Sequence, residues 1–292
     1  MRKRNKTSIL IHFIFIAFGA MCIIPFMMVV SASFTSVNDL SYHGFSVLPP
    51  KVDFTAYAYL FKNPRQIING YIVTTFITIV GTILSVIVMS MAAYALSRPR
   101  YKLKGFMTWY IFFPTLFSGG MVSSYVVNTK YLHLTDSIWV LILPGLINVF
   151  HIIMLRTFFK ELPDGLFDAA MMDGAGEFRI YLTIALPLSK PSIATVAFLG
   201  ALSRWNEWYR AMLYIRSDEK YPLQYLLQRM MMNIQELLKE MQYVPAIANT
   251  QELPGENLRM ALLVVCIGPM MLFFPFFQKY FTKVMTVGAV KG

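Results

Sequence analysis

The sequence has few of the residues on which soluble enzymes and secreted domains depend. Only two of its 292 residues are cysteines, so it has no disulfide framework. Its four histidines show no metal-ligand spacing, and we expect no metal site. Charged residues make up only 14% of the chain and hydrophobic residues 57%, with a mean hydropathy of +0.55. This balance excludes a soluble globular domain and indicates an integral membrane protein.

The sequence also lacks the common catalytic motifs. It contains no G-x-x-x-x-G-K-[ST] run, so the chain cannot cradle nucleotide phosphates by that route. It has no nucleophile elbow, no helix with paired histidines and no carboxylate-rich apolar segment. We therefore expect no catalytic and no cofactor-binding residues in this chain. Energy for any work must come from a partner or from a gradient.

What the sequence does contain is a series of long apolar segments. Each is long enough for a helix to cross a hydrocarbon core of ~30 Å, which takes roughly 20 residues. The six predicted transmembrane helices cover residues 9–33, 71–96, 106–127, 137–155, 192–215 and 258–281. A signal peptide competes for the first segment, but its length and the lack of a clear cleavage site favour a spanning helix. We expect an all-α polytopic membrane protein with one transmembrane domain over residues 1–292.

Basic residues are distributed unevenly between the two ends of these helices. Fifteen fall in the segments of one face, namely the N-terminus, the loop 97–105, residues 156–190 and the C-terminus. The short loops of the opposite face hold four. By the positive-inside rule the face with fifteen is cytoplasmic, which puts both termini in the cytoplasm and the chain in the cytoplasmic membrane. The net charge of +11 is then a topology signal, and we expect no nucleic-acid partner.

One cytoplasmic segment, residues 161–191, is both charged and internally ordered. Pro163 stops the preceding helix, Asp164 can serve as the N-cap of a short helix, and Gly174 ends that helix. A second helix follows, and its apolar residues recur at helical spacing on one face. These residues are Phe178, Tyr181, Leu182 and Ala185. Pro187 and Pro191 close the predicted helix-turn-helix.

This segment resembles the coupling loop of ABC importer permeases, commonly written E-A-A, three residues, G, nine residues, I, one residue, L-P. The matching residues are Asp168, Ala169, Ala170, Gly174, Ile184, Leu186 and Pro187. In that family the loop sits in a cleft on a separate ATPase subunit and transmits the power stroke. Asp168 departs from the usual Glu, which keeps the charge and shortens its reach by one methylene.

Further segments resemble the second permease subunit of carbohydrate importers of the maltose type, in an oligosaccharide or aldouronate-like subgroup. They are 222–227, 255–261 and the ending FFPFFQKYFTKVMTVGAVKG. The resemblance implies a homologous second permease, two ATPase subunits that hold ATP and Mg, and an extracytoplasmic solute-binding protein that delivers an oligosaccharide. It also implies that the C-terminal tail enters the ATPase dimer interface. The tail residues concerned are Gly288, Val290, Lys291 and Gly292.

The fifth predicted transmembrane helix carries a concentration of ionisable groups. Glu207 lies three residues from both Arg204 and Arg210 and can pair with either. Neighbouring side chains suit a sugar, since aromatic rings stack on apolar sugar faces and amides bond hydroxyls. The candidate substrate-cavity residues are Trp205, Asn206, Glu207 and Trp208. An interfacial aromatic belt with an ion pair is the alternative interpretation.

Together these observations predict the permease subunit of an ATP-driven importer of an oligosaccharide, which works by alternating access while a separate chain hydrolyses ATP. Two alternatives stay open. An ABC permease for another solute class would keep the coupling loop, and a gradient-driven secondary transporter would use Glu207 as its titrating group. The extracytoplasmic loop 216–257 also has two interpretations, because its amphipathic part can reach into the solute-binding protein or rest on the membrane.

Overall fold

The computed structural model describes residues 6–62, 64–117, 119–243 and 255–289. Every regular element in these ranges is helical, which agrees with the predicted all-α class. Contacts divide the chain into two compact units. Unit 1 consists of Met1–Ile67 and Leu226–Pro269, and unit 2 of Ile68–Tyr225 and Met270–Gly292. The single transmembrane domain stays a prediction.

Unit 1 contains the first helices and parts of the last two. Its elements are α1 (Lys6–Ser33), α2 (Val37–His43), α3 (Thr55–Leu60), most of α14 (Leu223–Tyr243) and the first part of α15 (Glu256–Ala289). The polar region after α1 contains the short helices α2 and α3. Ser36 starts α2 because its hydroxyl accepts the backbone N–H of Asp39.

The end of α1 is fixed by polar and aromatic contacts within unit 1. The hydroxyls of Ser33 and Tyr57 are 2.9 Å apart, and the ring of Phe34 stacks on Tyr57 at 4.9 Å. Asn257, at the start of α15, donates from Nδ2 to the carbonyl of Thr35 at 3.2 Å. The chain that leaves α1 is therefore tied to both α3 and α15.

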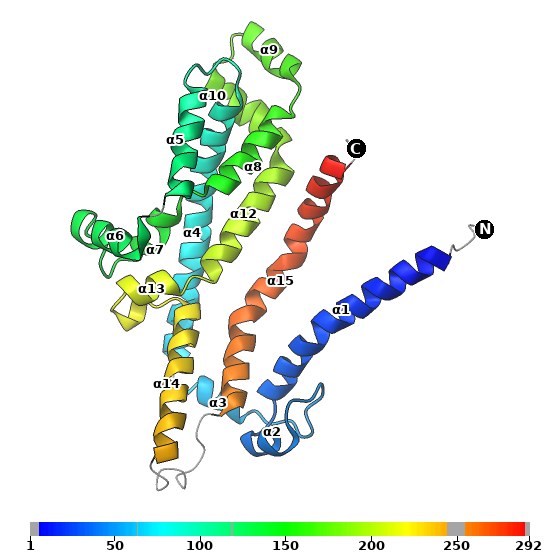
Figure 1. Ribbon diagram of the computed structural model, residues 1–292, viewed down its shortest axis with the longest axis vertical. Helices are drawn as coiled ribbons and strands as arrows, with labels where there is room; N and C mark the ends of the chain where they lie inside the picture. Colours follow the sequence, from blue (N-terminus) through cyan, green and yellow to red (C-terminus); the bar gives the residue numbers. More distant parts are fainter. Residues whose placement is uncertain (1–5, 63, 118, 244–254, 290–292) are drawn as a thin grey trace. The chain divides into compact units, whose positions relative to one another are not determined.

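Unit 2 contains most of the remaining helices. Figure 1 shows α4, α5, α8 and α12 side by side, with α9 and α10 at one end. The elements are α4 (Pro64–Ser97), α5 (Lys104–Leu116), α6 (Gly120–Val126), η1 (Val127–Tyr131), α7 (Trp139–Ile142), η2 (Leu143–Gly145), α8 (Val149–Lys160), α9 (Asp164–Met172), α10 (Glu177–Ile180), η3 (Tyr181–Ala185), α11 (Leu186–Leu188), α12 (Lys190–Trp205), α13 (Tyr209–Tyr214) and η4 (Asp218–Lys220). The segments η1 and η3 are π-helical, and η2 and η4 are 3₁₀ turns.

Several predicted transmembrane helices are broken. In the described ranges, two helices are long and apolar enough to cross a membrane, α1 over Leu10–Ser33 and α4. Three bent pairs raise this to as many as five: α5 with α6–η1 (113°), α7–η2 with α8 (51°), and α10–α11 with α12 (82°). The helix α15 runs without interruption through the predicted span 258–281. The count of six stays a prediction.

Two of the three breaks have local causes in the sequence. The predicted span 106–127 is interrupted before Gly120, whose φ of 77° favours glycine. The span 137–155 is interrupted beyond Pro144 in η2, and Asn148 then caps α8 by accepting the N–H of His151 at 3.2 Å. The span 192–215 stops at Trp205 and resumes in α13. These three spans are thus pairs of shorter helices and not continuous ones.

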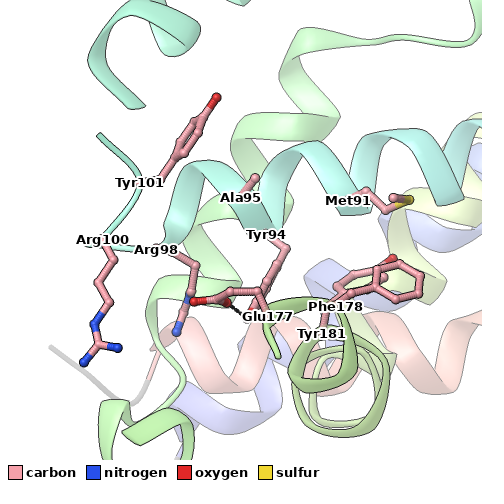
Figure 2. Close-up of a pocket in the computed structure, with 9 residues that line it drawn as sticks. All are labelled: Met91, Tyr94, Ala95, Arg98, Arg100, Tyr101, Glu177, Phe178 and Tyr181. Atoms are coloured by element: carbon pink, nitrogen blue, oxygen red, sulfur yellow. Dashed lines mark hydrogen bonds between the residues drawn. The ribbon is translucent and has the colours of Figure 1, made fainter. Parts of the chain in front are cut away.

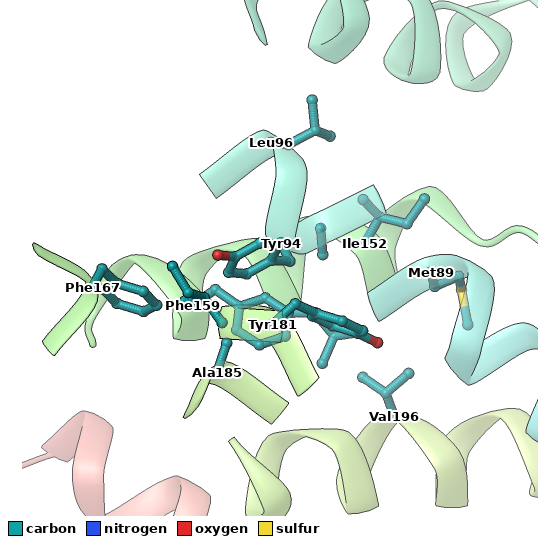
Figure 3. Close-up of a cluster of buried hydrophobic side chains, with 12 residues drawn as sticks. Met89, Tyr94, Leu96, Ile152, Phe159, Phe167, Tyr181, Ala185 and Val196 are labelled. Atoms are coloured by element: carbon teal, nitrogen blue, oxygen red, sulfur yellow. The ribbon is translucent and has the colours of Figure 1, made fainter. Parts of the chain in front are cut away.

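The hydrophobic core of unit 2 lies where α4, α8, η3 and α12 meet (Figure 3). Phe159 of α8 is fully buried, and Tyr94 of α4 packs edge-on against it with ring centroids 5.9 Å apart. Tyr94 also contacts Tyr181 of η3, at 5.3 Å. One aromatic side chain of α4 therefore joins α8 to the second helix of segment 161–191.

A polar clamp joins two loops of unit 2 through Asp136, whose φ is 55°. Its carboxylate accepts the backbone N–H groups of Arg216 and Ser217 at 3.0 Å each, the Ser217 hydroxyl, and Nζ of Lys220 at 2.9 Å. Its own N–H donates to the carbonyl of Tyr214. These hydrogen bonds, those of Ser217 most of all, hold the pKa of the Asp136 carboxyl well below its usual range.

We expect Asp136→Asn to lower the thermal unfolding temperature at pH 7 by about 2–4 °C, because it removes the charge and keeps a residue that tolerates positive φ. A carboxyl whose pKa is depressed on folding stabilises the fold above its unfolded pKa of ~3.9 and loses this effect as pH falls through the folded pKa. The difference between variant and wild type should thus be constant from about pH 5 to 8 and shrink below about pH 4. Thermal unfolding of the purified protein across this range measures it. No difference at pH 7, or one that persists unchanged in strong acid, would contradict the clamp.

Candidate functional site

Segment 161–191 forms a helix-turn-helix in which α9 is the first helix and α10 with η3 the second. The helix α9 begins at Asp164 itself, so Pro163 occupies the N-cap position and the expectation of an Asp164 N-cap is wrong. Asp164 instead places its carboxylate in the first turn, beside the positive end of the helix dipole.

Gly174 ends the first helix in the way its sequence position predicts. Its φ is 78°, its N–H donates to the carbonyl of Met171, and the N–H of Ala175 donates to the carbonyl of Ala170, each at 3.0 Å. This is the Schellman pattern of helix termination. A Cβ on Gly174 would meet nothing within 4 Å, so the backbone conformation and not crowding requires glycine here.

The apolar face of the second helix differs from the prediction. Tyr181 and Ala185 are buried, but Phe178 is 62% exposed and Leu182 47% exposed, while Ile180 is buried in their place. Leu182 lies in the π-helical turn Tyr181–Ala185, whose hydrogen bonds join residues five apart and so move its side chains off the spacing of an α-helix.

The residues of the coupling-loop pattern divide into an exposed and a half-buried group. Asp168, Ala169, Gly174 and Pro187 are exposed, whereas Ala170, Ile184 and Leu186 are half-buried. The same surface of α9 carries two exposed apolar side chains that the pattern does not include, Leu166 and Met172, the latter 88% exposed. The loop thus presents a mixed polar and apolar surface of the kind that partner proteins bind.

The first helix is anchored to α4 through Arg98, which follows the last residue of α4. The guanidinium lies over the ring of Phe167 at 3.7 Å from its centroid and 5.2 Å from that of Tyr94. Its Nη2 donates to the carbonyl of Phe159 at 3.0 Å, and its Nε donates to the Ser97 hydroxyl at 3.2 Å. Arg98 and Phe167 are both buried, so this cation–π contact is shielded from water.

The second helix is anchored to α4 by two hydrogen bonds. The hydroxyl of Tyr94 donates to Oε2 of Glu177 at 2.7 Å, and the hydroxyls of Ser90 and Tyr181 are 2.7 Å apart. Figure 2 shows Tyr94, Glu177 and Tyr181 at a cavity of about 500 Å³ between the end of α4 and α10–η3. The lining residues are Met91, Tyr94, Ala95, Arg98, Arg100, Tyr101, Glu177, Phe178 and Tyr181.

Asp168 of α9 has a weaker contact with the connection between α4 and α5. Its carboxylate lies 3.9 Å from Nη2 of Arg100, and both side chains are largely exposed, so this ion pair contributes little to stability. Arg100 also donates from Nη1 to the sulfur of Met171 at 2.8 Å. Asp168 therefore remains available to a partner.

Sequence reasoning missed the anchoring residues Tyr94, Arg98, Phe167 and Glu177. In the sequence Arg98 is one of four cations in a basic loop, and charge alone does not tell the buried one from the exposed ones. The signal in the sequence was its position directly after the last turn of α4, six residues before α5 begins. Phe167 stands beside the matched Asp168 but on the opposite, inward face of α9.

Within the bundle, Arg204 of α12 joins three helical segments. Its Nη2 donates to the carbonyl of Gly145 in η2 at 2.8 Å and to the Ser85 hydroxyl of α4, and its Nη1 donates to the carbonyl of Gly200 at 3.2 Å. Arg204 is buried and has no ion pair within 4 Å among the described residues, and it satisfies a carbonyl that the break in the fourth predicted span exposes. Glycine at position 81 leaves room for it, since a Cβ there would lie 2.7 Å from Cδ of Arg204.

Glu207 pairs with Arg210 and not with Arg204. The ion pair measures 3.3 Å, and Oε1 of Glu207 also accepts the backbone N–H of Arg210 at 3.0 Å. Of the other candidate cavity residues, Trp205 is buried with its ring 6.5 Å from that of Tyr71, while Asn206 and Trp208 are exposed in the break between α12 and α13. The four residues are therefore adjacent but do not all face one space.

The two terminal predictions are only partly within the described residues. Gly288 lies in the last turn of α15, while Val290, Lys291 and Gly292 lie outside them. In the loop 216–257, the amphipathic stretch forms the 21-residue helix α14, and residues 244–254 lie outside the described part.

The chain is similar to curated transport proteins over nearly its whole length. It is 34% identical to the "Polygalacturonan/rhamnogalacturonan transport system permease protein YtcP" of Bacillus subtilis, over 99% of this chain and 100% of that protein. It is 36% identical to "Protein LplC" of the same organism, over 94% and 91%. No family profile matches the chain.

A solved structure is similar as well. A chain of the crystal structure of a bacterial ABC transporter involved in the import of the acidic polysaccharide alginate superposes with a TM-score of 0.81. The two chains are 30% identical, and the match covers 96% of this chain and 98% of the other.

We expect Gly81→Ala to destabilise the protein by about 1–3 kcal/mol, because the new Cβ displaces Arg204 and leaves the Gly145 carbonyl unpaired. The matched control is Gly268→Ala in α15, where a Cβ meets nothing within 4 Å and helix propensity alone should stabilise by up to about 1 kcal/mol. Thermal unfolding of the purified variants gives both values. If the two variants behave alike, Arg204 is not held by close packing against Gly81.

Proposed function

The chain belongs to the permease subunits of carbohydrate ABC importers, and on this premise we propose that segment 161–191 is the element through which ATP hydrolysis on a partner chain moves its transmembrane helices. The chain is a transport subunit and not an enzyme. Its apolar helices place it in a membrane.

The observation that carries the proposal is the anchoring of both loop helices to the last turns of α4. Arg98 binds Phe167 of α9, and Tyr94 binds Glu177 of α10. A force applied to α9 from outside is therefore transmitted to a 34-residue helix that is long and apolar enough to span the membrane. The exposed Asp168, Ala169 and Gly174 would contact the ATPase subunit, with Ile184, Leu186 and Pro187 joining the loop to α12.

The remaining arrangement follows from family membership and from the distribution of charge. Six transmembrane helices would place both termini in the cytoplasm of a cell with the loop 161–191 on the same side. The functional complex would contain a homologous second permease, two ATPase subunits that bind ATP and Mg, and an extracytoplasmic solute-binding protein. The tail residues Gly288, Val290, Lys291 and Gly292 would contact the ATPase dimer, and α14 would face the binding protein or the membrane surface.

For the substrate, the similar proteins favour an acidic oligosaccharide. Polygalacturonan appears in the name of one relative, and the similar solved structure belongs to an importer of the acidic polysaccharide alginate. Arg204, Glu207 and Arg210 together carry one net positive charge in the membrane segment, which would attract an acidic sugar. Glu207, Asn206 and Trp208 are the candidate sugar-facing residues, and the buried Trp205 would support them from behind.

Membership of an ATP-driven family removes the support for the gradient-driven alternative. The mechanism would be alternating access, in which ATP binding closes the ATPase dimer and the loop 161–191 turns the paired permeases outward. Hydrolysis would return them to the inward state. The chain itself would transmit the movement of the ATPase subunits to the membrane helices and form part of the substrate pathway.

We expect Gly174→Asp to abolish the stimulation of ATPase activity by the liganded binding protein in the purified complex, because a bulky charge on the exposed turn prevents docking. The control is Gly174→Ala, which carries at least as much backbone strain at this positive φ without the charge and should keep most of the stimulation. Both variants are measured after confirming that they assemble with their partners. Full stimulation of the Gly174→Asp complex would show that this turn does not contact the ATPase, and loss in both variants would assign the effect to backbone strain.

A further inference from the structure

A groove of about 460 Å³ lies between α5 and α8, outside the coupling loop. Its α5 side follows one helical face, since the residues recur every three to four positions. The lining residues are Lys104, Gly105, Thr108, Trp109 and Phe112 of α5 and Arg156 of α8. The groove is therefore basic at one end and aromatic along its length.

The basic end has an excess of positive charge. Among the described residues no carboxylate lies within ion-pair distance of Lys104 or Arg156. Lys160, one turn beyond Arg156 on α8, is close enough to both cations that they repel its charge. Among the described residues, Arg156 donates only from Nε, to the carbonyl of Leu96 at 3.2 Å, so its terminal nitrogens have no acceptor there. The positive charges of Lys104, Arg156 and Lys160 lie close together and therefore attract an anion.

The start of α5 adds to this attraction. The helix begins at Lys104, and its N-cap residue Leu103 supplies no side-chain hydrogen bond to the first turn. The N–H of Lys104 donates to the carbonyl of Tyr101 at 3.2 Å, and the positive end of the helix dipole lies at the basic end of the groove. Gly105 lines the groove there, and a Cβ at this position would meet nothing within 4 Å.

The aromatic part of the groove indicates what kind of anion fits. Trp109 is 60% exposed and Phe112 43% exposed, one and two turns into α5 from Lys104. The first residue of α5 and the last turn of α8 lie at the same end of two packed helices, which is where a membrane protein meets the lipid headgroups. A free phosphate would use the cations and leave the aromatic face uncovered, whereas a phospholipid would use both.

We propose that this groove binds an anionic phospholipid, with its phosphate between Lys104 and Arg156 and an acyl chain along Trp109 and Phe112. The inference rests on the proposed membrane arrangement of α5 and α8 and adds a lipid site to it. Anionic phospholipids are attracted to basic residues at the membrane surface, and a groove between helices adds shape to this attraction.

The test is native mass spectrometry of the intact transporter complex titrated with phosphatidylglycerol, with phosphatidylcholine as the neutral comparison. We expect Lys104→Gln to lower the affinity for phosphatidylglycerol about fivefold, and Lys104→Gln with Arg156→Gln roughly 25-fold. Because Arg156 also bonds Leu96, Lys104→Gln with Lys160→Gln is a second double variant. The matched control is Lys102→Gln, an exposed lysine two residues away that does not line the groove, and its affinity should equal that of the wild type.

Equal affinity of Lys104→Gln and the wild type would overturn the proposal, as would an equal loss in Lys102→Gln. Displacement of phosphatidylglycerol by inorganic phosphate at similar concentration would make the groove a site for a soluble anion. Loss of an ATPase subunit with unchanged lipid binding would make it a protein interface. Sugar uptake by the same wild-type preparation tests the transport function separately, because lipid adducts form whether or not uptake occurs.

Discussion

Burial of the Arg98 guanidinium is the constraint on which the proposed coupling end of the molecule depends. A charge removed from water must be compensated, and here the Phe159 carbonyl, the Ser97 hydroxyl and the rings of Phe167 and Tyr94 do so. These groups come from the ends of α4, α8 and α9. The three helices therefore cannot move apart at this point without leaving the cation uncompensated, so α9 and α4 move together.

A second buried arginine, Arg204, compensates a backbone polar group inside the helix bundle of unit 2. The break in the predicted fourth span exposes the Gly145 carbonyl where water is scarce, and Arg204 bonds it from a space that Gly81 leaves open. Arg210, neutralised by Glu207, lies against Gly145 from another direction. Broken helices of this kind are suited to a transporter, because short segments can reorient without unfolding a whole span.

The sequence predicted those features that depend on local composition and spacing. The lengths of the apolar segments predicted α1 and α4. The pattern of Asp168, Gly174 and Pro187 located the helix-turn-helix, because glycine at positive φ and proline at a helix start constrain the backbone at their own positions. Of the predicted stripe, Tyr181 and Ala185 are buried, but Phe178 and Leu182 are exposed, and Leu182 lies in a π-helical turn that changes the spacing. Arg98 and Phe167 were missed because their contact joins residues about seventy positions apart, and no single-chain periodicity reports such a pair. The residues proposed for docking to other subunits stay predictions.

The contact between Arg98 and Phe167 is tested most directly by the number of sugars imported per ATP hydrolysed in proteoliposomes, for the wild type and for Phe167→Leu. Leucine keeps most of the buried apolar volume and removes the ring face that the cation contacts. If this contact transmits motion from α9 to α4, Phe167→Leu should hydrolyse ATP at a near-normal rate while the sugars imported per ATP fall about fivefold. An unchanged ratio would show that α9 moves α4 by some other route.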